Sequence, residues 1–444
     1  MKIGFVALSG IRACDDELLQ MGLTLPGFVE RSKVIASLPS LGLLTLAGMT
    51  PPEHDLHYFE MADLDSGLNM QEQLWTFDLI AISSYSAQIY EAYQLADMVR
   101  RKNVPVVMGG LHVSSLPMEA KKHCDAVIIG EGELSWFNVL TDLEKGKLQP
   151  VYGDKAGEFD LAEAPMPAFE LLDIDKYNRL TVQTSRGCAH RCEFCASSIL
   201  LTNRYKQKPA EKVLAEIDKI KTLWSHPFIE LADDNSFVNK QYWKKLLPEL
   251  KKRKIRWFTE TDLSISRDAE LLRMLRESGC AQVLIGFESV SQAALDGLEI
   301  RRNWKARQAY AYKEAIATIQ SFGISVNGCF ILGLDEHDPA VFDQVYEFVI
   351  ESGLHEVQIT IQTAFPGTPL YRRMKAENRI LDNRAWQKCT LFDINFHPRN
   401  MSVAQLSSGF KKLSARLYSD ECTRYRRRKF KSQLREIVKA KVTA

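Results

Sequence analysis

The chain has 444 residues, of which 45% are hydrophobic, and a formal net charge of +1 at neutral pH. This length predicts two or three domains with sizeable apolar cores, and the balanced charge argues against a protein that binds nucleic acid over its whole surface. Charged residues from Arg12 onward come too early for a signal peptide, and no run of about 18 apolar residues predicts a membrane span. We therefore expect a cytoplasmic protein with reduced cysteines and no membrane partner.

Residues 1–150 alternate short apolar runs with helical patterns, which is typical of a parallel α/β sheet. The pattern predicts strands at 2–8, 55–61, 79–83, 104–108 and 126–129, and helices at 41–49 and 87–101. Small or polar residues follow three of these strands: Ser84, then Gly109 and Gly110, then Glu131 and Gly132. Ligands of open α/β sheets bind outside the carboxyl ends of the strands, and glycine there lets a ligand approach the backbone closely.

Residues 151–180 are expected to form a linker that straps the first domain to the second. Ala164-Pro-Met-Pro-Ala168 cannot continue a helix. The segment 169–177 mixes apolar and acidic residues, which indicates an ordered strap.

Three cysteines stand close together in the stretch Cys188-Ala-His-Arg-Cys192-Glu-Phe-Cys195. This C-x₃-C-x₂-C spacing places three thiolates on one short loop, and three thiolates can hold three irons of a cubane iron–sulfur cluster. The fourth iron then stays open and can bind a small molecule, as the open position of a catalytic metal site does. The alternative is a zinc site completed by His190 or a distant residue, although zinc sites more often show paired C-x₂-C halves.

Residues 181–370 predict six βα repeats and therefore a partial barrel. Strands are expected at 181–184, 228–232, 256–261, 282–287, 325–332 and 356–362, with helices at 209–223, 241–252 and 268–278 among them. The active face of such a barrel is the carboxyl end of its strands. The cysteine loop follows the first strand, and polar residues end the next three: Asp233 and Asp234, then Glu260, then Glu288 and Ser289.

The cysteine loop, with Phe194 before its last cysteine, resembles the cluster loop of the radical S-adenosylmethionine (SAM) enzymes. Residues 1–150 resemble the cobalamin-binding domain that precedes many of these enzymes; the matching segments are Pro39-Ser-Leu-Gly-Leu-Leu44, Asp78-Leu-Ile-Ala-Ile-Ser-Ser84, Val106-Val-Met-Gly-Gly-Leu-His112 and Gly130-Glu-Gly-Glu133. The resemblance implies a [4Fe–4S] cluster on Cys188, Cys192 and Cys195. It also implies that SAM chelates the open iron and is cleaved reductively to a 5′-deoxyadenosyl radical.

The resemblance further implies which residues contact each cofactor. For SAM they are Phe194, Asp233, Asp234, Glu260, Glu288, Ser289 and Gly333; for cobalamin they are Ser84, Gly109, Gly110, Glu131 and Gly132. Two departures from the family pattern stand out. Ala232-Asp-Asp-Asn235 replaces the Gly-Gly-Glu that often holds the SAM amino group, and the D-x-H-x-x-G motif with a cobalt-ligating histidine is absent, because Glu60 stands where its glycine belongs. A cofactor-free domain that only shapes the substrate pocket is the alternative for residues 1–150.

Residues 371–444 are expected to form a helical extension. Ser402-Val-Ala-Gln405 is a capping-box pattern that starts a helix. The last helix, over 424–441, carries nine basic residues and one acid. We favour a solvated helix over an RNA-contacting tail for this segment, and a nucleic-acid partner is not expected.

The expected fold class is α/β: an N-terminal flavodoxin- or Rossmann-like parallel sheet (1–150), a linker strap (151–180), a partial (β/α)6 TIM-type radical SAM barrel (181–370) and a C-terminal helical extension (371–444). The expected function is a cobalamin-dependent radical SAM methyltransferase that acts on an unactivated carbon of a small molecule and receives electrons from a flavodoxin or ferredoxin. The alternative keeps the radical step without methyl transfer: an oxygen-independent cyclase, a ring rearrangement or aminocarboxypropyl transfer.

Overall fold

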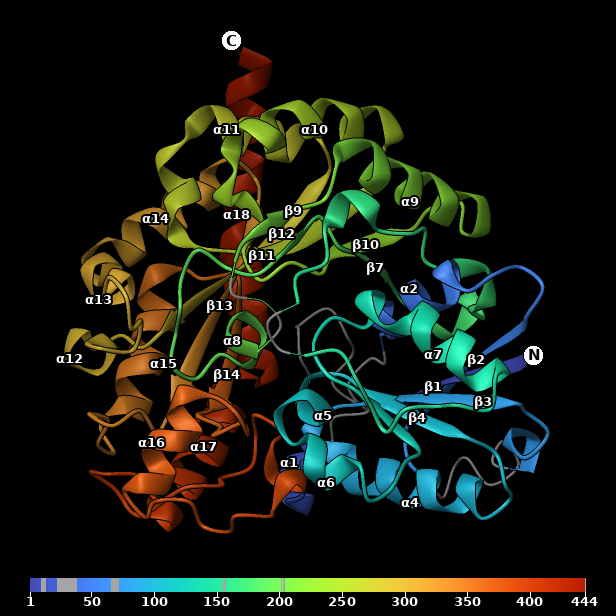
Figure 1. The fold of residues 1–444 in the computed structure, drawn as a ribbon. Coiled ribbons are helices and arrows are strands. Elements are labelled where there is room, and N and C mark those ends of the chain that lie inside the picture. Colours follow the sequence, from blue (N-terminus) through green and yellow to red (C-terminus); the bar gives the residue numbers. More distant parts are fainter. Residues whose placement is uncertain are drawn as a thin grey trace.

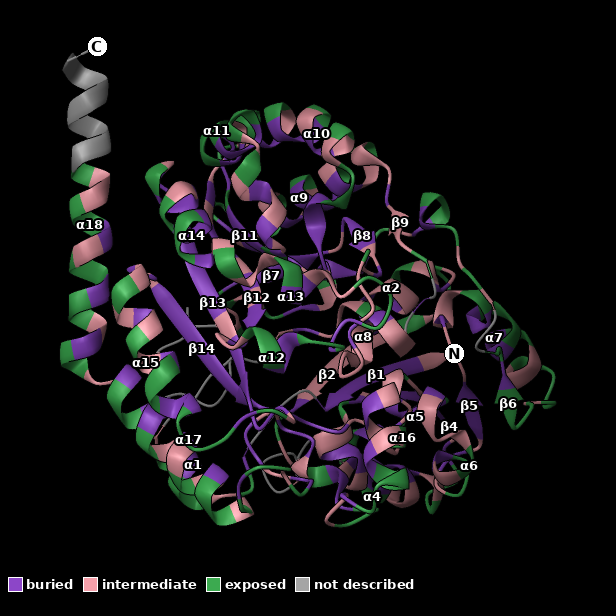
Figure 2. Cartoon of the chain, turned by 90° about the vertical axis from the view of Figure 1, so that its left-hand side faces the viewer, coloured by how far each residue is buried: buried purple, intermediate pink, exposed green. Residues whose placement is uncertain are grey.

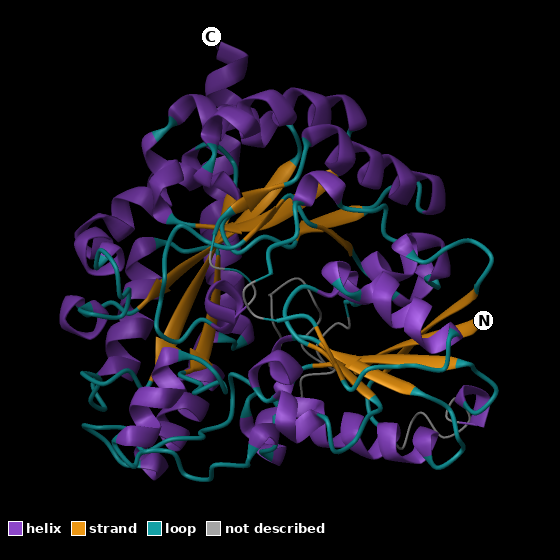
Figure 3. Ribbon diagram, in the orientation of Figure 1, coloured by secondary structure: helices purple, strands orange, loops and turns teal. Residues whose placement is uncertain are grey.

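The computed structural model describes residues 1–8, 13–21, 38–64, 72–154, 157–200, 202 and 204–443, with side chains up to 435. Two six-stranded sheets dominate it, and they lie on opposite sides of the centre of the molecule (Figure 1). The helices form an outer shell around both sheets (Figure 3). Within the described residues, no helix is both long enough and apolar enough to cross a membrane.

The first sheet is parallel throughout, in the order β2-β1-β3-β4-β5-β6. Its strands are β1 (Lys2–Leu8), β2 (Asp55–Met61), β3 (Leu79–Ser84), β4 (Val106–Gly109), β5 (Ala126–Ile128) and β6 (Val151–Tyr152). The first five agree with the predicted strands to within two residues. The two-residue β6 was not predicted, and it comes from the segment expected as a linker.

Helices cover both faces of this sheet, which explains why its strands are apolar runs rather than alternating patterns. One face packs against α4 (Ile89–Arg100), whose Ala92, Leu95 and Ala96 are fully buried. The other face packs against α2 (Leu41–Met49) and α7 (Trp136–Glu144).

The second sheet is also parallel, and its six strands follow in chain order from one edge to the other, as in a partial barrel. They are β7 (Leu180–Val182), β10 (Phe228–Leu231), β11 (Arg256–Thr261), β12 (Cys280–Glu288), β13 (Ser325–Leu332) and β14 (Glu356–Ile361). The predicted strands agree with these to within two residues at each end. This sheet and its outer helices share the largest apolar core of the molecule.

The remaining helices connect and enclose the strands (Figure 2). They are α1 (Asp16–Gln20), α5 (Leu111–Ser115), α6 (Pro117–Ala120), α8 (Ala196–Leu200), α9 (Ala210–Leu223), α10 (Lys240–Arg253), α11 (Ala269–Glu277), α12 (Gln292–Leu295), α13 (Trp304–Gln308), α14 (Tyr312–Ser321), α15 (Val341–Ser352), α16 (Pro369–Ala376), α17 (Val403–Leu417) and α18 (Asp420–Thr443). The predicted capping box at Ser402 is confirmed at the start of α17. Two short strands pair with each other in an antiparallel manner: β8 (Ser185–Arg186), which precedes the cysteine loop in sequence, and β9 (Lys206–Gln207), which follows it.

The segment between the two sheets is ordered as three 3₁₀ turns, at Leu161–Glu163, Phe169–Leu171 and Ile174–Lys176. It lies tightly on α2, where a Cβ atom at Gly48 would come within 1.8 Å of the Met166 carbonyl oxygen. Only glycine permits this approach. The segment therefore docks on the first sheet before the chain enters the second.

The C-terminal helix α18 is attached to β14 through a buried cation. The Arg426 guanidinium has no exposed surface, donates to the Leu417 carbonyl oxygen at 2.9 Å and lies 3.9 Å from the Glu356 carboxylate.

We predict that Arg426→Ala lowers the free energy of unfolding by about 3 kcal/mol, because it breaks a buried ion pair and removes packed methylenes. The exposed neighbour Arg428→Ala should stay within about 0.5 kcal/mol of wild type. Thermal unfolding of the two variants measures this, and equal stabilities would contradict it.

Candidate active site

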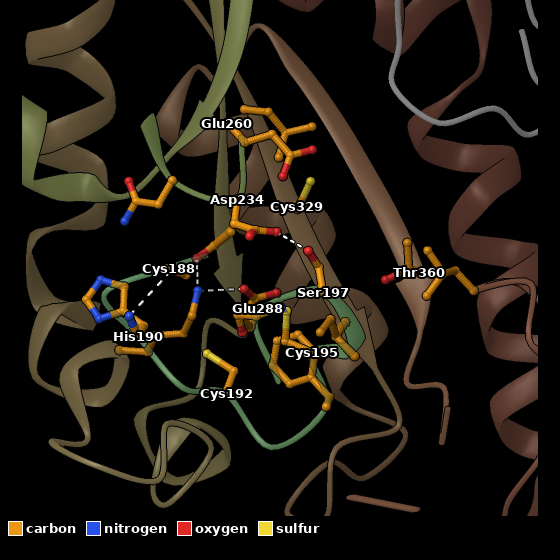
Figure 4. A pocket seen from close by; sticks show the side chains of 18 of the residues that line it. Cys188, His190, Cys192, Cys195, Ser197, Asp234, Glu260, Glu288, Cys329 and Thr360 are labelled. Carbon is orange, nitrogen blue, oxygen red and sulfur yellow. Dashed lines mark hydrogen bonds and ion pairs between the residues drawn. The ribbon is translucent and has the colours of Figure 1, made fainter. Parts of the chain in front are cut away.

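The carboxyl end of the second sheet encloses a cavity of about 390 Å³. All three predicted cluster cysteines line it, together with Phe194 from the same loop. Asp234, Glu260 and Glu288 reach it from the ends of β10, β11 and β12 (Figure 4). The structure thus brings together most of the residues predicted for the cluster and SAM.

Asp234 fixes the cysteine loop at both ends. Its carboxylate accepts a hydrogen bond from the Gly187 N–H at 3.0 Å, just before the first cysteine, and another from the Ser197 hydroxyl, just after the last. Burial raises the pKa of this carboxyl. Asp234 therefore orders the loop as well as facing the cavity.

Three further contacts hold the loop between these ends. The His190 imidazole lies 3.0 Å from Asp262, the Glu193 carboxylate accepts two hydrogen bonds from Arg373 at 2.6 and 3.0 Å, and the Glu299 carboxylate accepts the Arg191 N–H at 3.2 Å. Burial alone would raise the pKa of Asp262, but hydrogen bonds from His190 and Ser264 outweigh it and hold that pKa below its usual range. Arg373 was not predicted as a site residue, whereas Asp262 was expected among the polar residues at the end of the third strand.

The first sheet also holds the loop. Arg186, two residues before Cys188, pairs with Glu131 and with Glu133, the latter at 2.8 Å. Lys206 donates to both oxygens of Glu131 at 2.6 Å, and the Phe159 N–H donates to it as well. Glu131 was predicted as a cobalamin contact, but its carboxylate joins the first sheet to the entry of the cysteine loop.

The three thiols are ready for metal only after they lose their protons. Burial raises the pKa of Cys188 to about 11 and raises the pKa values of Cys192 and Cys195 as well. Metal binding supplies the driving force for that deprotonation. Among the described residues, no group of three or more His, Cys, Asp or Glu side chains could hold a single metal ion. In a cubane the three thiolates bind three different irons, so they need not meet at one point.

Glu288 is held in an unusual conformation next to Cys192. Its φ of 65° lies in the left-handed region that non-glycine residues rarely adopt. Lys305 donates to its carboxylate at 2.6 Å and to the Gly286 carbonyl oxygen at 2.8 Å. A Cβ at Gly286 would lie 2.3 Å from that carboxylate, so a larger residue there would displace the Glu288 side chain. Lys305, on α13, was not predicted, and nothing in its sequence context indicated it.

Glu260 faces the cavity as a carboxylic acid. Its side chain is exposed and lines the cavity, and desolvation together with the nearby Glu230 and Asp234 raises its pKa to about 8. At neutral pH it is therefore mostly protonated and can donate a hydrogen bond. Gln358 and Thr360 of β14 and Gln362, just beyond that strand, line the same cavity, and the buried Gln362 Oε1 has no hydrogen-bond partner.

Three predicted SAM contacts lie outside this cavity. Asp233 is buried and accepts hydrogen bonds from Thr184, Ser185 and Ser236. Ser289 is fully buried and bonds to His337 at 2.9 Å. Gly333, with φ of 88°, packs against Leu406 of α17. All three residues therefore contact other parts of the protein at the strand ends instead of facing the cavity.

A second cavity, of about 430 Å³, lies at the carboxyl end of the first sheet. Ser84 and Gly110, two of the predicted cobalamin contacts, line it, and Gly110 has φ of 100°. Ser86 and His112 line it too; the His112 Nδ1 lies 3.0 Å from the Ser86 hydroxyl. Gly109 and Gly132 do not reach it.

The two cavities share a wall of three side chains: Ser197, Phe365 and Leu391. Leu391 has φ of 69°, which is strained for a bulky residue. The Ile361 N–H donates to its carbonyl oxygen at 2.7 Å and holds it in place. The ends of both sheets thus open toward the same point.

Comparison with known proteins agrees with this geometry. The model of the "Radical SAM superfamily" matches residues 182–349, that of the "B12 binding domain" matches 32–136, and a domain of unknown function matches 368–443. Bacteriochlorophyllide d C-12(1)-methyltransferase of Chlorobaculum tepidum is 26% identical over 81% of this chain and 79% of its own length. The anaerobic magnesium-protoporphyrin IX monomethyl ester cyclase of Cereibacter sphaeroides is 24% identical over 90% of this chain and 71% of its own length.

A solved structure shares the whole fold. The radical SAM methyltransferase TsrM from Kitasatospora setae, with cobalamin and a [4Fe–4S] cluster bound, superposes with a TM-score of 0.67 over 99% of both chains at 14% identity. The fold and the site define a radical SAM enzyme. The chain belongs to the radical SAM superfamily, in the group with an N-terminal B12-binding domain.

The cofactors of this group are a [4Fe–4S] cluster, SAM and cobalamin. The residues present fit them. Three thiols, one buried and two partly buried, line one cavity. An unpaired amide oxygen and a carboxyl with a raised pKa face the same space, and the second cavity opens at the strand ends, where open α/β sheets bind ligands. That the individual side chains named above contact these cofactors stays our prediction.

We predict that Glu131→Gln destabilises the protein by about 3 kcal/mol, because it removes the buried carboxylate that pairs with Lys206 and one of the two carboxylates that pair with Arg186. Hydroxocobalamin affinity, followed by absorbance titration, should change less than about twofold, since Glu131 does not line the second cavity. The exposed Glu163→Gln is the matched control and should match wild type. Loss of cobalamin affinity without loss of stability would instead make Glu131 a cobalamin contact.

A second prediction concerns pH. Because the folded-state pKa of Glu260 is raised to about 8, the folded protein binds more protons than the unfolded chain, and stability falls as pH rises from about 5 to 8. Glu260→Gln removes this loss. Melting temperatures of the two proteins should therefore diverge in favour of the variant between pH 6 and pH 8. A constant difference across that range would refute the raised pKa.

Proposed function

We propose that this protein is a cobalamin-dependent radical SAM methyltransferase that methylates an unactivated carbon of a small molecule. The observation that carries the proposal is the wall shared by the two cavities. A methyl donor in one cavity and a hydrogen-abstracting radical in the other must both reach one carbon atom, and the wall at Ser197, Phe365 and Leu391 is where the two cavities meet.

When bound, the cluster and SAM supply a carbon-centred radical and cobalamin supplies the methyl group. The chain's own residues bind these cofactors and orient them. Cys188, Cys192 and Cys195 hold the cluster, Lys305 keeps Glu288 aimed into the cavity, and the neutral groups of β14 and Glu260 offer hydrogen bonds without a net charge. Phe365 and Leu391 keep the meeting point apolar, which excludes water from a reactive radical.

The alternative is a radical SAM reaction without methyl transfer, such as the cyclisation carried out by the anaerobic cyclase of Cereibacter sphaeroides. The apolar lining of the second cavity fits a bound cofactor or a bound substrate equally. The two functions differ in cobalt content and in whether the product gains a methyl group.

The deciding experiment is anaerobic reconstitution with iron, sulfide and hydroxocobalamin. We predict about four irons and one cobalt per chain, and transfer of labelled methyl from SAM to a small-molecule carbon in a metabolite extract. Cys188→Ala should lose the iron and the label transfer, because two thiolates cannot hold the cubane, while keeping the cobalt.

Iron without cobalt, and label-free products, would favour the alternative. Zinc without iron would rule out both functions.

We also propose an acidic flavodoxin or ferredoxin as the source of the electron that the cluster needs.

A further inference from the structure

The segment between α12 and α13 runs directly along the cysteine loop. Cys192 and Glu299 form an antiparallel bridge. The Glu193 N–H donates to the Leu298 carbonyl oxygen at 2.9 Å, and the Ile300 N–H donates to the Arg191 carbonyl oxygen at 2.9 Å. Ile300 is therefore one hydrogen bond away from the residue that precedes Cys192.

The outer side of this segment is exposed and basic. Ile300 is 51% exposed, Arg301 and Arg302 are exposed, and Arg191 is half-buried beside them. We call these four residues the Arg–Ile surface. Figure 2 shows α12 and α13, which flank it in sequence, turned toward the viewer.

The charges of the Arg–Ile surface are not neutralised locally. Within the part of the chain that the structure describes, no ion pair is recorded for the guanidinium groups of Arg191, Arg301 or Arg302. The neighbouring Glu299 is 2% exposed, and its carboxylate accepts the backbone N–H groups of those same three residues. Since the whole chain carries a net charge of only +1, three unpaired arginines create a local positive field.

We propose that the Arg–Ile surface is the docking site of an acidic one-electron carrier protein, of the flavodoxin or ferredoxin class. The inference rests on the proposed function, because a radical SAM enzyme needs one electron on its cluster. Complexes for electron transfer are small and short-lived, and complementary charge steers their encounter. Ile300 provides an apolar centre, and the three arginines provide a positive rim.

The geometry suits the transfer. The carrier loses one electron and the cluster gains one; no bond forms or breaks, and no proton moves. The electron enters next to Cys192, through a segment that is hydrogen-bonded to the cysteine loop on both sides of that residue.

The test is stopped-flow reduction of the reconstituted cluster by reduced flavodoxin, at low and at high salt. Arg301→Glu/Arg302→Glu should lower the second-order rate constant at low salt by about tenfold or more and flatten its salt dependence, because rim charges act on association. Lys121→Glu/Lys122→Glu changes two consecutive exposed lysines in the turn after α6. It makes the same change in net charge and should leave the rate near wild type. Reduction by photoreduced 5-deazariboflavin, a small neutral donor, should be equal in all three proteins.

Equal effects of the two double variants, or no effect of either, would overturn the proposal. If the charge reversal disturbs cluster content, Arg301→Gln/Arg302→Gln gives the same comparison with a smaller expected loss. The cluster is reduced before any methyl transfer, so the rate constants test the docking site even if the product proves to be unmethylated. A failure of the proposed function would show instead as missing cobalt or missing label.

Discussion

The structure depends on partly buried charges that hold one loop in place. Arg186, Asp234, Asp262 and Arg373 each contribute an ion pair or hydrogen bond to the cysteine loop or its entry. They belong to β8, to the ends of β10 and β11, and to α16, and the partner of Arg186 belongs to the first sheet. Charges removed from water are stable only when paired. The three thiols therefore converge only when both sheets and the C-terminal extension are folded around them.

The same arrangement places the carboxyl end of the first sheet next to the barrel cavity. Its strand ends open into a cavity that shares Ser197, Phe365 and Leu391 with the barrel cavity. Ser197 is also the residue that anchors the cysteine loop to Asp234. The strained backbone of Leu391 at this wall is the kind of conformation that a fold retains where geometry matters for function. The radical SAM identity and the cofactor set expected from the sequence are confirmed by the family matches.

The sequence predicted the strands well because buried parallel strands are continuous apolar runs. It could not predict which of two adjacent carboxylates faces the cavity, and Asp233 and Asp234 point to different partners. Arg373 is 180 positions from its partner Glu193, and only tertiary structure reveals such a pair. Glu131 illustrates the same limit: its motif predicts a cofactor contact, but its carboxylate binds Arg186 and Lys206, which lie far along the chain.

The most direct test of the account is electron paramagnetic resonance of the reconstituted, reduced protein with and without SAM. A preformed three-cysteine site leaves one iron open for SAM, so we predict a [4Fe–4S]⁺ signal whose g-values shift when SAM is added. A cluster signal that SAM leaves unchanged, or a protein that binds no cluster, would contradict it.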